Sequence, residues 1–334
     1  MLDNWRKKLR FDPVPPLLAS EDEALRYFAR RDLLGEDPGP VSRLWELPAP
    51  RRILRKQLPD GSWPRAGAIK HAAINYHLIE AWRHLRVLVQ QYGFTREHPQ
   101  AQMAAEFILT CQTEEGDIRG FLANQFATYY TGALMAVLIQ AGYEDDPRIE
   151  RGFRWLLSMR QEDQGWTVPL ITHKFDRASM YRLTSQHAPP VEPDRSKPFS
   201  HNWTGMVLRA FAAHPEHRRS EAARIAARHL ASRFFKPDSY TSYQAASYWV
   251  RFEYPFWWNH LVAALDSISL IGLPQEDKQI RLGLTWLIDH QEHSGLWRLS
   301  YVDTAKKAHE TAKRQSMALW VSLAICRVLR RFYG

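Results

Sequence analysis

Hydrophobic positions recur along the chain in helical runs, and no segment shows the alternation typical of a β-strand. One set of predicted helices lies at about 43–57, 99–112, 147–160, 220–234 and 278–291. A second set, each member preceding one of the last four, lies at about 70–91, 123–141, 202–213 and 257–271. Two more are expected at about 308–332 and at 20–34, where Ser20 and Glu23 have the spacing of a capping box. The pattern predicts an all-α chain of about eleven paired helices.

A turn recurs at the end of the first set of helices. It reads Gln, three residues, Gly, one residue, aromatic in QLPDGSW (57–63) and QEHSGLW (291–297), and QTEEGDI (112–118) has Ile118 last. A fourth copy, RQEDQGW (160–166), has Arg160 and Gln164 at the Gln and Gly positions, and FFKPDSY (234–240) is degenerate. An Ile or Leu stands ten residues before every final position, at 53, 108, 156, 230 and 287. These landmarks in register indicate a repeat of about 50 residues.

A helix-start signal lies twenty residues before three of the final positions. It is His98-Pro99, Asp146-Pro147 and Asp277-Lys278. Asp is a good N-cap, and Pro suits the first helical position because its missing N–H would have no partner there.

The turns at 57–63 and 291–297 and the segment AGYEDDPRIERGFRWLLSMRQEDQGW resemble the repeats of the squalene-cyclase and protein-prenyltransferase superfamily. The resemblance covers most of residues 40–300. It implies an α/α toroid, with inner helices around a central cavity and outer helices enclosing them. It further implies that the Gln caps helix ends and that the Trp stacks on the neighbouring repeat. An open helical solenoid is the alternative.

The connections between predicted helices differ in length. We expect a single toroid domain over 1–334, with an N-terminal extension at 1–19 and long loops at 167–201 and 236–256. These loops are rich in His, Tyr, Trp and Arg. Long loops in a compact domain usually serve function, so they predict the open end of the cavity.

Polar and aromatic residues gather where the inner helices are expected to begin. Aromatic walls with a few polar groups are typical of a ligand pocket. The predicted binding residues are Asn75, Tyr129, Tyr130, Asn202, Trp203, Arg251, Trp257, Trp258 and Asn259. Candidate acids and bases are His173, Asp176, Tyr181, His201 and His260. The competing interpretation is that the aromatics pack between helices, the Asn and His residues cap them, and the loop at 173–187 is pinned by ion pairs.

The catalytic motifs of the resembled family are absent. An Asp-X-Asp-Asp acid would need three acidic residues, but the pair Asp145-Asp146 is preceded by Tyr143 and Glu144 and occupies the helix-start position. No Asp-X-Cys stands in the chain, so we expect no zinc, and no cofactor is expected. Cys111 and Cys326 lie in helical runs and are expected to be core residues.

The net charge and the lengths of the apolar runs indicate which kinds of binding partner and cellular location to expect. The net charge of +9 is spread along the chain rather than gathered into a stripe, so nucleic acid is not expected. No signal peptide or run of about 18 apolar residues is visible, which favours a cytoplasmic protein without a transmembrane segment. Peripheral membrane contact and the oligomeric state are left open.

Three functions fit these observations. The first is a terpenoid-cyclase-like or prenyltransferase-like protein that binds an apolar, isoprenoid-like small molecule, with catalysis undecided. The second is a sugar-acid or polysaccharide lyase or hydrolase on an α/α barrel. The third is a non-catalytic binding or scaffold protein. We favour the first.

Overall fold

The computed structural model describes residues 3–240, 245–302 and 311–334. Within these residues it contains helices and three isolated β-bridges but no β-strand, which confirms the all-α prediction. The helices form two compact units. The middle unit is Val41–Ala226, and the terminal unit combines Met1–Pro40 with Ala227–Gly334. The start of the helix predicted at 308 lies outside the described residues.

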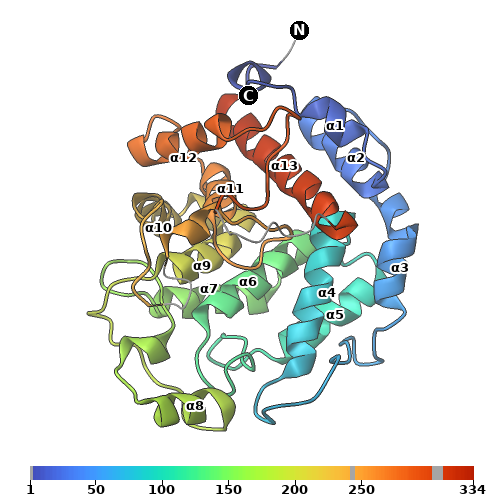
Figure 1. Ribbon diagram of the computed structural model, residues 1–334. Coiled ribbons are helices and arrows are strands. Elements are labelled where there is room, and N and C mark those ends of the chain that lie inside the picture. The colour runs from blue at the N-terminus through green and yellow to red at the C-terminus, as the bar shows by residue number, and fades with distance from the viewer. Residues whose placement is uncertain (1–2, 241–244, 303–310) are drawn as a thin grey trace. The chain divides into compact units, whose positions relative to one another are not determined.

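The middle unit consists of two layers of helices (Figure 1). Its first layer holds α4 (Tyr76–Tyr92), α6 (Thr128–Leu138) and α9 (His201–Ala213), with α6 packed against both others. The second layer holds α3 (Pro48–Leu54) and α5 (Pro99–Thr110), which contact α4, and α7 (Pro147–Ser158), which contacts α6. Every residue of α6 is buried, because this helix has neighbours in both layers. These layers correspond to the predicted inner and outer helices.

The terminal unit joins the two ends of the chain. Its helices are α1 (Val14–Leu18), α2 (Glu23–Ala29), α11 (Leu261–Ile271), α12 (Lys278–Asp289) and α13 (Ala312–Tyr333); α10 (Glu221–Ser232) spans the division between the units. The last helix, α13, packs against α11 and α2 (Figure 1). The indole of Trp320 donates to Asp22 (2.9 Å), and Arg327 forms an ion pair with Asp32. The end of the chain therefore meets its beginning.

Three predicted helix starts are confirmed and one is wrong. His98, Asp146 and Asp277 each accept a hydrogen bond from a main-chain N–H in the first turn of their helices. The proposed capping box of Ser20 and Glu23 is not formed. Asp22 caps α2 instead, accepting from the N–H groups of Ala24 and Leu25, since its carboxylate is a better placed acceptor.

Three inner helices begin later than predicted, at Tyr76, Thr128 and Leu261 rather than at 70, 123 and 257. Asn75 and His260 are N-caps, accepting from the N–H groups of Leu78 and Ala263. Ala123 has a positive φ of 50°, which a helix cannot contain. Half of the polar and aromatic residues assigned to first turns therefore precede their helices, namely Asn75 and residues 257–260.

The recurring Trp holds its turn to the preceding helix by one repeated hydrogen bond. Its indole N–H donates to the main-chain oxygen ten residues earlier: Trp63 to Ile53 (2.9 Å), Trp166 to Leu156 (2.7 Å) and Trp297 to Leu287 (2.7 Å). The rings of Trp63 and Trp166 also pack on residues of the following inner helices, His84 of α4 and Phe211 of α9. The stacking implied by the resemblance is therefore present in these two copies.

The recurring Gln connects one repeat to the next. The side-chain amide of Gln57 donates to the main-chain oxygens of Gly61 and Gln100 (3.0 and 2.8 Å), and that of Gln112 donates to those of Gly116 and Arg148 (both 2.8 Å). Gln100 and Arg148 lie in the first turns of α5 and α7. In these two copies the Gln therefore binds a main-chain oxygen in the first turn of the following outer helix, whereas the resemblance implied a helix cap.

In the last repeat, the N-terminal segment takes the place of a following helix. The amide of Gln291 donates to the main-chain oxygens of Gly295 (2.9 Å) and Phe11 (2.8 Å), and its oxygen accepts from the N–H groups of Arg10 and Phe11. The donation to Phe11 repeats the contact by which the earlier Gln side chains hold α5 and α7. Within the predicted 1–19 extension, Arg10 and Phe11 are thus bound to the last repeat turn. A complete ring around a central cavity remains a prediction.

Candidate functional site

Five aromatic side chains of the middle unit form a continuous group of contacting rings, here called the aromatic cluster: Trp82, Phe121, Tyr129, Tyr130 and Trp203. Tyr129 lies between Tyr130 and Trp203, with ring centroids 4.2 Å from each. Phe121 stacks on Tyr130 at 3.7 Å, and Trp82 meets these two rings edge-on at 5.8 and 5.3 Å. The three residues predicted from sequence, Tyr129, Tyr130 and Trp203, are therefore brought together.

The first turns of α6 and α9 position the aromatic cluster. Tyr129 and Tyr130 lie in the first turn of α6, and Trp203 lies in the first turn of the neighbouring helix α9, which Ser200 caps. The hydroxyl of Thr128 donates to the main-chain oxygen of Thr167 (2.8 Å), which connects the start of α6 to the loop that leads toward α9. Because both helices begin at the same side of their layer, their first-turn aromatics meet.

The cluster is apolar and nearly buried. Tyr129, Tyr130 and Trp203 keep 5 to 8% of their surface exposed, so the group is not wholly enclosed. Burial, with a smaller effect of Tyr130, raises the pKa of Tyr129 well above its usual value. The phenol of Tyr129 therefore stays neutral, and the cluster offers aromatic faces rather than an anion.

A buried cation borders the cluster. The guanidinium of Arg86 on α4 lies 4.9 Å from the ring of Trp82, and Arg86 is only 7% exposed. Arg86, Trp82 and Phe121 were not among the residues predicted from the sequence, which lie mainly around the predicted helix starts. The signal for Trp82 and Arg86 was the aromatic and basic content of α4 beyond its first turn, whereas Phe121 lies in the loop before α6.

Three other predicted polar residues of the middle unit, Asn75, His201 and Asn202, lie at the starts of inner helices. Asn75 caps α4, and its amide contacts the sulfur of Cys111 at 3.5 Å. His201 and Asn202 are buried in the first turn of α9. The expectation that Asn residues cap helices is therefore met at Asn75, while a ligand contact for any of the three remains a prediction.

The predicted residues of the terminal unit are held by local contacts. One carboxylate oxygen of Glu253 accepts from the main-chain N–H groups of Trp257 (3.1 Å) and Trp258 (2.9 Å), which turns this loop tightly before α11. His260 caps α11, and Asn259 beside it is buried. The guanidinium of Arg251 lies 4.4 Å from the ring of Tyr248. These five residues all precede α11, although residues 257–260 were predicted to lie in its first turn.

The loop at 167–201 is more regular than expected. It contains a 3₁₀ turn (Pro169–Thr172) and α8 (Arg177–Ser185). Asp176 is the N-cap of α8 and accepts from the N–H of Ser179, and His173 hydrogen-bonds to the main-chain oxygen of Glu192 (2.8 Å). Tyr181 is 57% exposed. The loop at 236–256 likewise contains a 3₁₀ turn (Ala246–Val250), and its residues 241–244 lie outside the described ones.

Asp146 acts as a structural residue. It caps α7 and pairs with Arg148, and the hydrogen bond from Arg148 holds the pKa of Asp146 below its usual value. A carboxylate held in its ionised form is the opposite of the neutral donor that alkene protonation needs. The two cysteines are unpaired, and burial raises the pKa of Cys111 to about 11, which leaves it an unreactive thiol.

The described residues contain no group of three or more His, Cys, Asp or Glu side chains arranged to hold a metal ion. None of the described helices combines the length and the apolar character needed to cross a lipid bilayer.

Comparison with known proteins gives distant structural likenesses. No protein-family model and no curated protein sequence matches the chain. Similar solved structures include a protein from Actinoplanes (17% identity, 87% of each chain, TM-score 0.41). They also include a ligand-free variant of the type II terpene cyclase MstE from Scytonema (12% identity, 98% of this chain and 86% of that one, TM-score 0.44). A polysaccharide lyase matches at 12% identity over 81% of this chain and 80% of that one, with a TM-score of 0.41. All three TM-scores are below 0.5, so these matches assign no function to this chain.

Proposed function

We propose that this protein binds an apolar, isoprenoid-like small molecule against the aromatic cluster of the middle unit. The observation that carries the proposal is the packing of Tyr129 against both Tyr130 and Trp203, with ring centroids 4.2 Å apart in each pair, across the starts of two adjacent inner helices. Stacked rings offer a large apolar area, and their faces attract the electron-poor regions of a ligand. Such a surface suits a polyene or a terpenoid better than a sugar, which needs several hydrogen-bonding partners.

Arg86 indicates which end of such a molecule would lie near α4. Its charge lies beside Trp82 at one edge of the cluster, so a carboxylate or phosphate on the ligand would be attracted to that edge. The aromatic faces would contact the hydrocarbon part. Binding is the whole of the proposal, and no catalytic step is assigned.

The experiment is mass spectrometry of the small molecules that co-purify with the full chain from its native host. We expect an apolar lipid-like species, and recovery of uronic acids alone would replace this proposal by the glycan alternative. Trp203→Ala should lower retention of the bound species by about tenfold, because it removes one of the stacked rings.

A matched control removes a tryptophan outside the cluster. Trp286 on α12 is half-buried and stacks on His290 at 3.9 Å. Trp286→Ala should leave retention unchanged, and equal loss in both variants would contradict the assignment of the cluster. Trp203→Phe, which keeps an aromatic ring, covers the case in which the alanine variant does not fold.

A further inference from the structure

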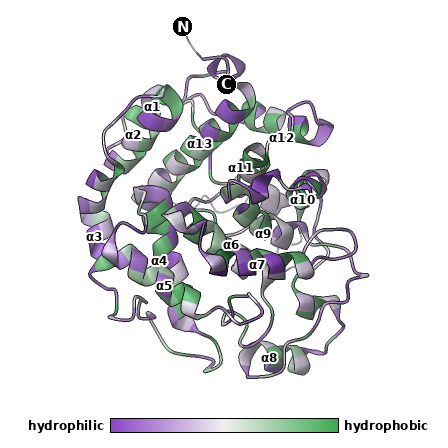
Figure 2. Cartoon of the chain, turned by 180° about the vertical axis from the view of Figure 1, so that it is seen from behind, coloured by the Kyte–Doolittle hydropathy of each residue, from purple (hydrophilic) through white to green (hydrophobic). Residues whose placement is uncertain are grey.

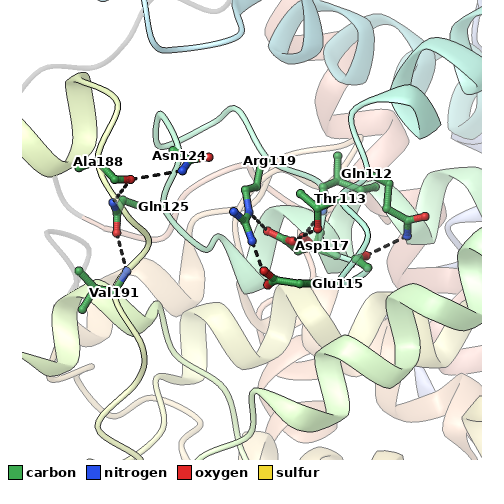
Figure 3. Close-up of polar contacts among 12 residues, drawn as sticks. Gln112, Thr113, Glu115, Asp117, Arg119, Asn124, Gln125, Ala188 and Val191 are labelled. Atoms are coloured by element: carbon green, nitrogen blue, oxygen red, sulfur yellow. Dashed lines mark hydrogen bonds and ion pairs between the residues drawn. The ribbon is translucent and has the colours of Figure 1, made fainter.

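The segment 173–187 projects from the middle unit between two fixed points. At its end, buried Gln125 donates to the main-chain oxygens of Ala188 (3.4 Å) and Pro189 (3.0 Å) and accepts from the N–H of Val191 (2.9 Å) (Figure 3). At its start, the hydroxyl of buried Thr172 accepts from the N–H of Asp194 (2.9 Å). The segment between these anchors, which includes α8, lies at the periphery in both ribbon views (Figures 1 and 2).

The projecting segment exposes apolar side chains together with a neighbouring loop. Phe175 is 37% and Tyr181 57% exposed. Tyr181 meets His71 edge-on, with ring centroids 5.5 Å apart, and this contact places residues 69–71 beside α8. Ile69 in that loop is 68% exposed. Among the described residues, three of the five most exposed large hydrophobic side chains therefore belong to residues 69–71 and 174–182, here called the rim patch.

The rim patch is also basic. It contains Lys70, Lys174, Arg177 and Arg182, all exposed, and one acid, Asp176. The carboxylate of Asp176 accepts from the N–H and the hydroxyl of Ser179, so it is engaged within the start of α8. Figure 2 shows hydrophilic and hydrophobic residues interleaved along this helix. The patch thus joins positive charge to exposed apolar rings.

We infer that the rim patch docks the protein on an anionic lipid surface. Aromatic and aliphatic side chains insert at the level of the lipid headgroups, while Lys and Arg extend their charges to anionic headgroup phosphates and carboxylates. An acidic polysaccharide would use the charges but gain nothing from the exposed Ile69. This inference rests on the surface of residues 69–71 and 174–182 and does not depend on the proposed ligand.

The test is co-sedimentation of the full chain with lipid vesicles. Binding is expected to vesicles that mix phosphatidylserine with phosphatidylcholine, to weaken at high salt, and to be much weaker with phosphatidylcholine alone. The charge variant Lys174→Glu with Arg177→Glu and the apolar variant Phe175→Ser with Tyr181→Ser should each weaken binding by about tenfold.

Control variants test whether vesicle binding depends on the rim patch or on any exposed hydrophobic side chain. Leu282 on α12 is 48% exposed but lies in the terminal unit, and Leu282→Ser should bind as the unchanged protein does. The inference would be overturned by equal binding to neutral and anionic vesicles, or by no binding to either. A loss of binding confined to the charge variant would also overturn it, in favour of a soluble polyanion. The changed side chains are exposed, and a circular dichroism melt verifies that each variant folds.

Discussion

At the scale of single residues, the repeat turn depends on glycines that accept no side chain. Gly61 and Gly116 have φ of 88° and 117°, and an added Cβ would lie 2.2 Å from the main-chain oxygen of Met103 and 2.5 Å from that of Arg151. The turn therefore combines a left-handed backbone with close approach to the following helix. In the fourth copy Gln164 has the same left-handed conformation, with φ of 70°.

Replacing such a glycine should destabilise the protein more than backbone strain alone does. Gly116→Ala is expected to lower the free energy of unfolding by about 3 kcal/mol, from the strained φ together with the clash. Gly67 is the control, since its φ is 105° but nothing lies within 4 Å of an added Cβ. Gly67→Ala should cost about 1 kcal/mol. Equal costs in chemical denaturation would show that the contact with Arg151 is unimportant.

His84 should make stability depend on pH. It packs on Trp63, and burial, then Arg83 and Lys56, lower the pKa of His84 from 6.5 to about 4. Between these values the unfolded chain binds a proton that the folded chain does not, so stability falls as pH decreases from 6.5 to about 4. The effect should reach about 1 kcal/mol, allowing for partial exposure to solvent.

The measurement is the free energy of unfolding of His84→Gln and of the unchanged protein across this pH range. The variant should lose part of the slope. Parallel curves would mean that His84 is protonated equally in both states.

The limits of sequence reasoning are clearest at individual residues. Trp63, Trp166 and Trp297 could be predicted because a large ring at a fixed spacing leaves a pattern. In the fourth turn, Gln161 rather than Arg160 donates to the following segment, at the main-chain oxygens of Asp194 and Lys197. A shift of one residue needs the backbone path, which a single sequence does not reveal.

At the scale of elements, helix existence could be predicted well and helix starts less well. The Asp-Pro and His-Pro pairs located α7 and α5, because the cap and the fixed φ of Pro are local properties. The starts of α4 and α11 were placed too early, since the preceding polar and aromatic residues are compatible with a helix until the loop packs. That packing determines which residues become the N-caps of these helices, namely Asn75 and His260.

The N-cap of α12 allows a direct test of whether such a local sequence signal also stabilises the helix. Asp277 accepts from the N–H groups of Gln279 and Ile280 (2.9 and 3.3 Å), so Asp277→Ala should lower stability by about 1 kcal/mol. The neighbouring Glu276 is exposed, and Glu276→Ala is the matched control, with an expected change below about 0.5 kcal/mol. Similar melting temperatures for the two variants would argue against a stabilising cap.

At the scale of the whole molecule, the sequence indicated a repeat but not how its last copy ends. Five turns in register predicted paired helices, and part of the aromatic cluster followed from where those helices begin. No pattern in the sequence showed that residues 10–12 replace an outer helix, because this segment lacks the repeat motif. Long-range partners of that kind depend on the three-dimensional path of the chain.

The Gln57 and Gln112 turns hold the following outer helices, and we claim that the Gln291 turn holds the N-terminal segment in the same way. Phe11 and His293 have ring centroids 5.1 Å apart. The decisive measurement is cross-linking of a Phe11→Cys, His293→Cys double variant with a short bismaleimide, using both single variants as controls. We predict a monomeric, internally cross-linked product of altered electrophoretic mobility in the double variant alone. Products that are only intermolecular, or no difference from the single variants, would contradict the claim.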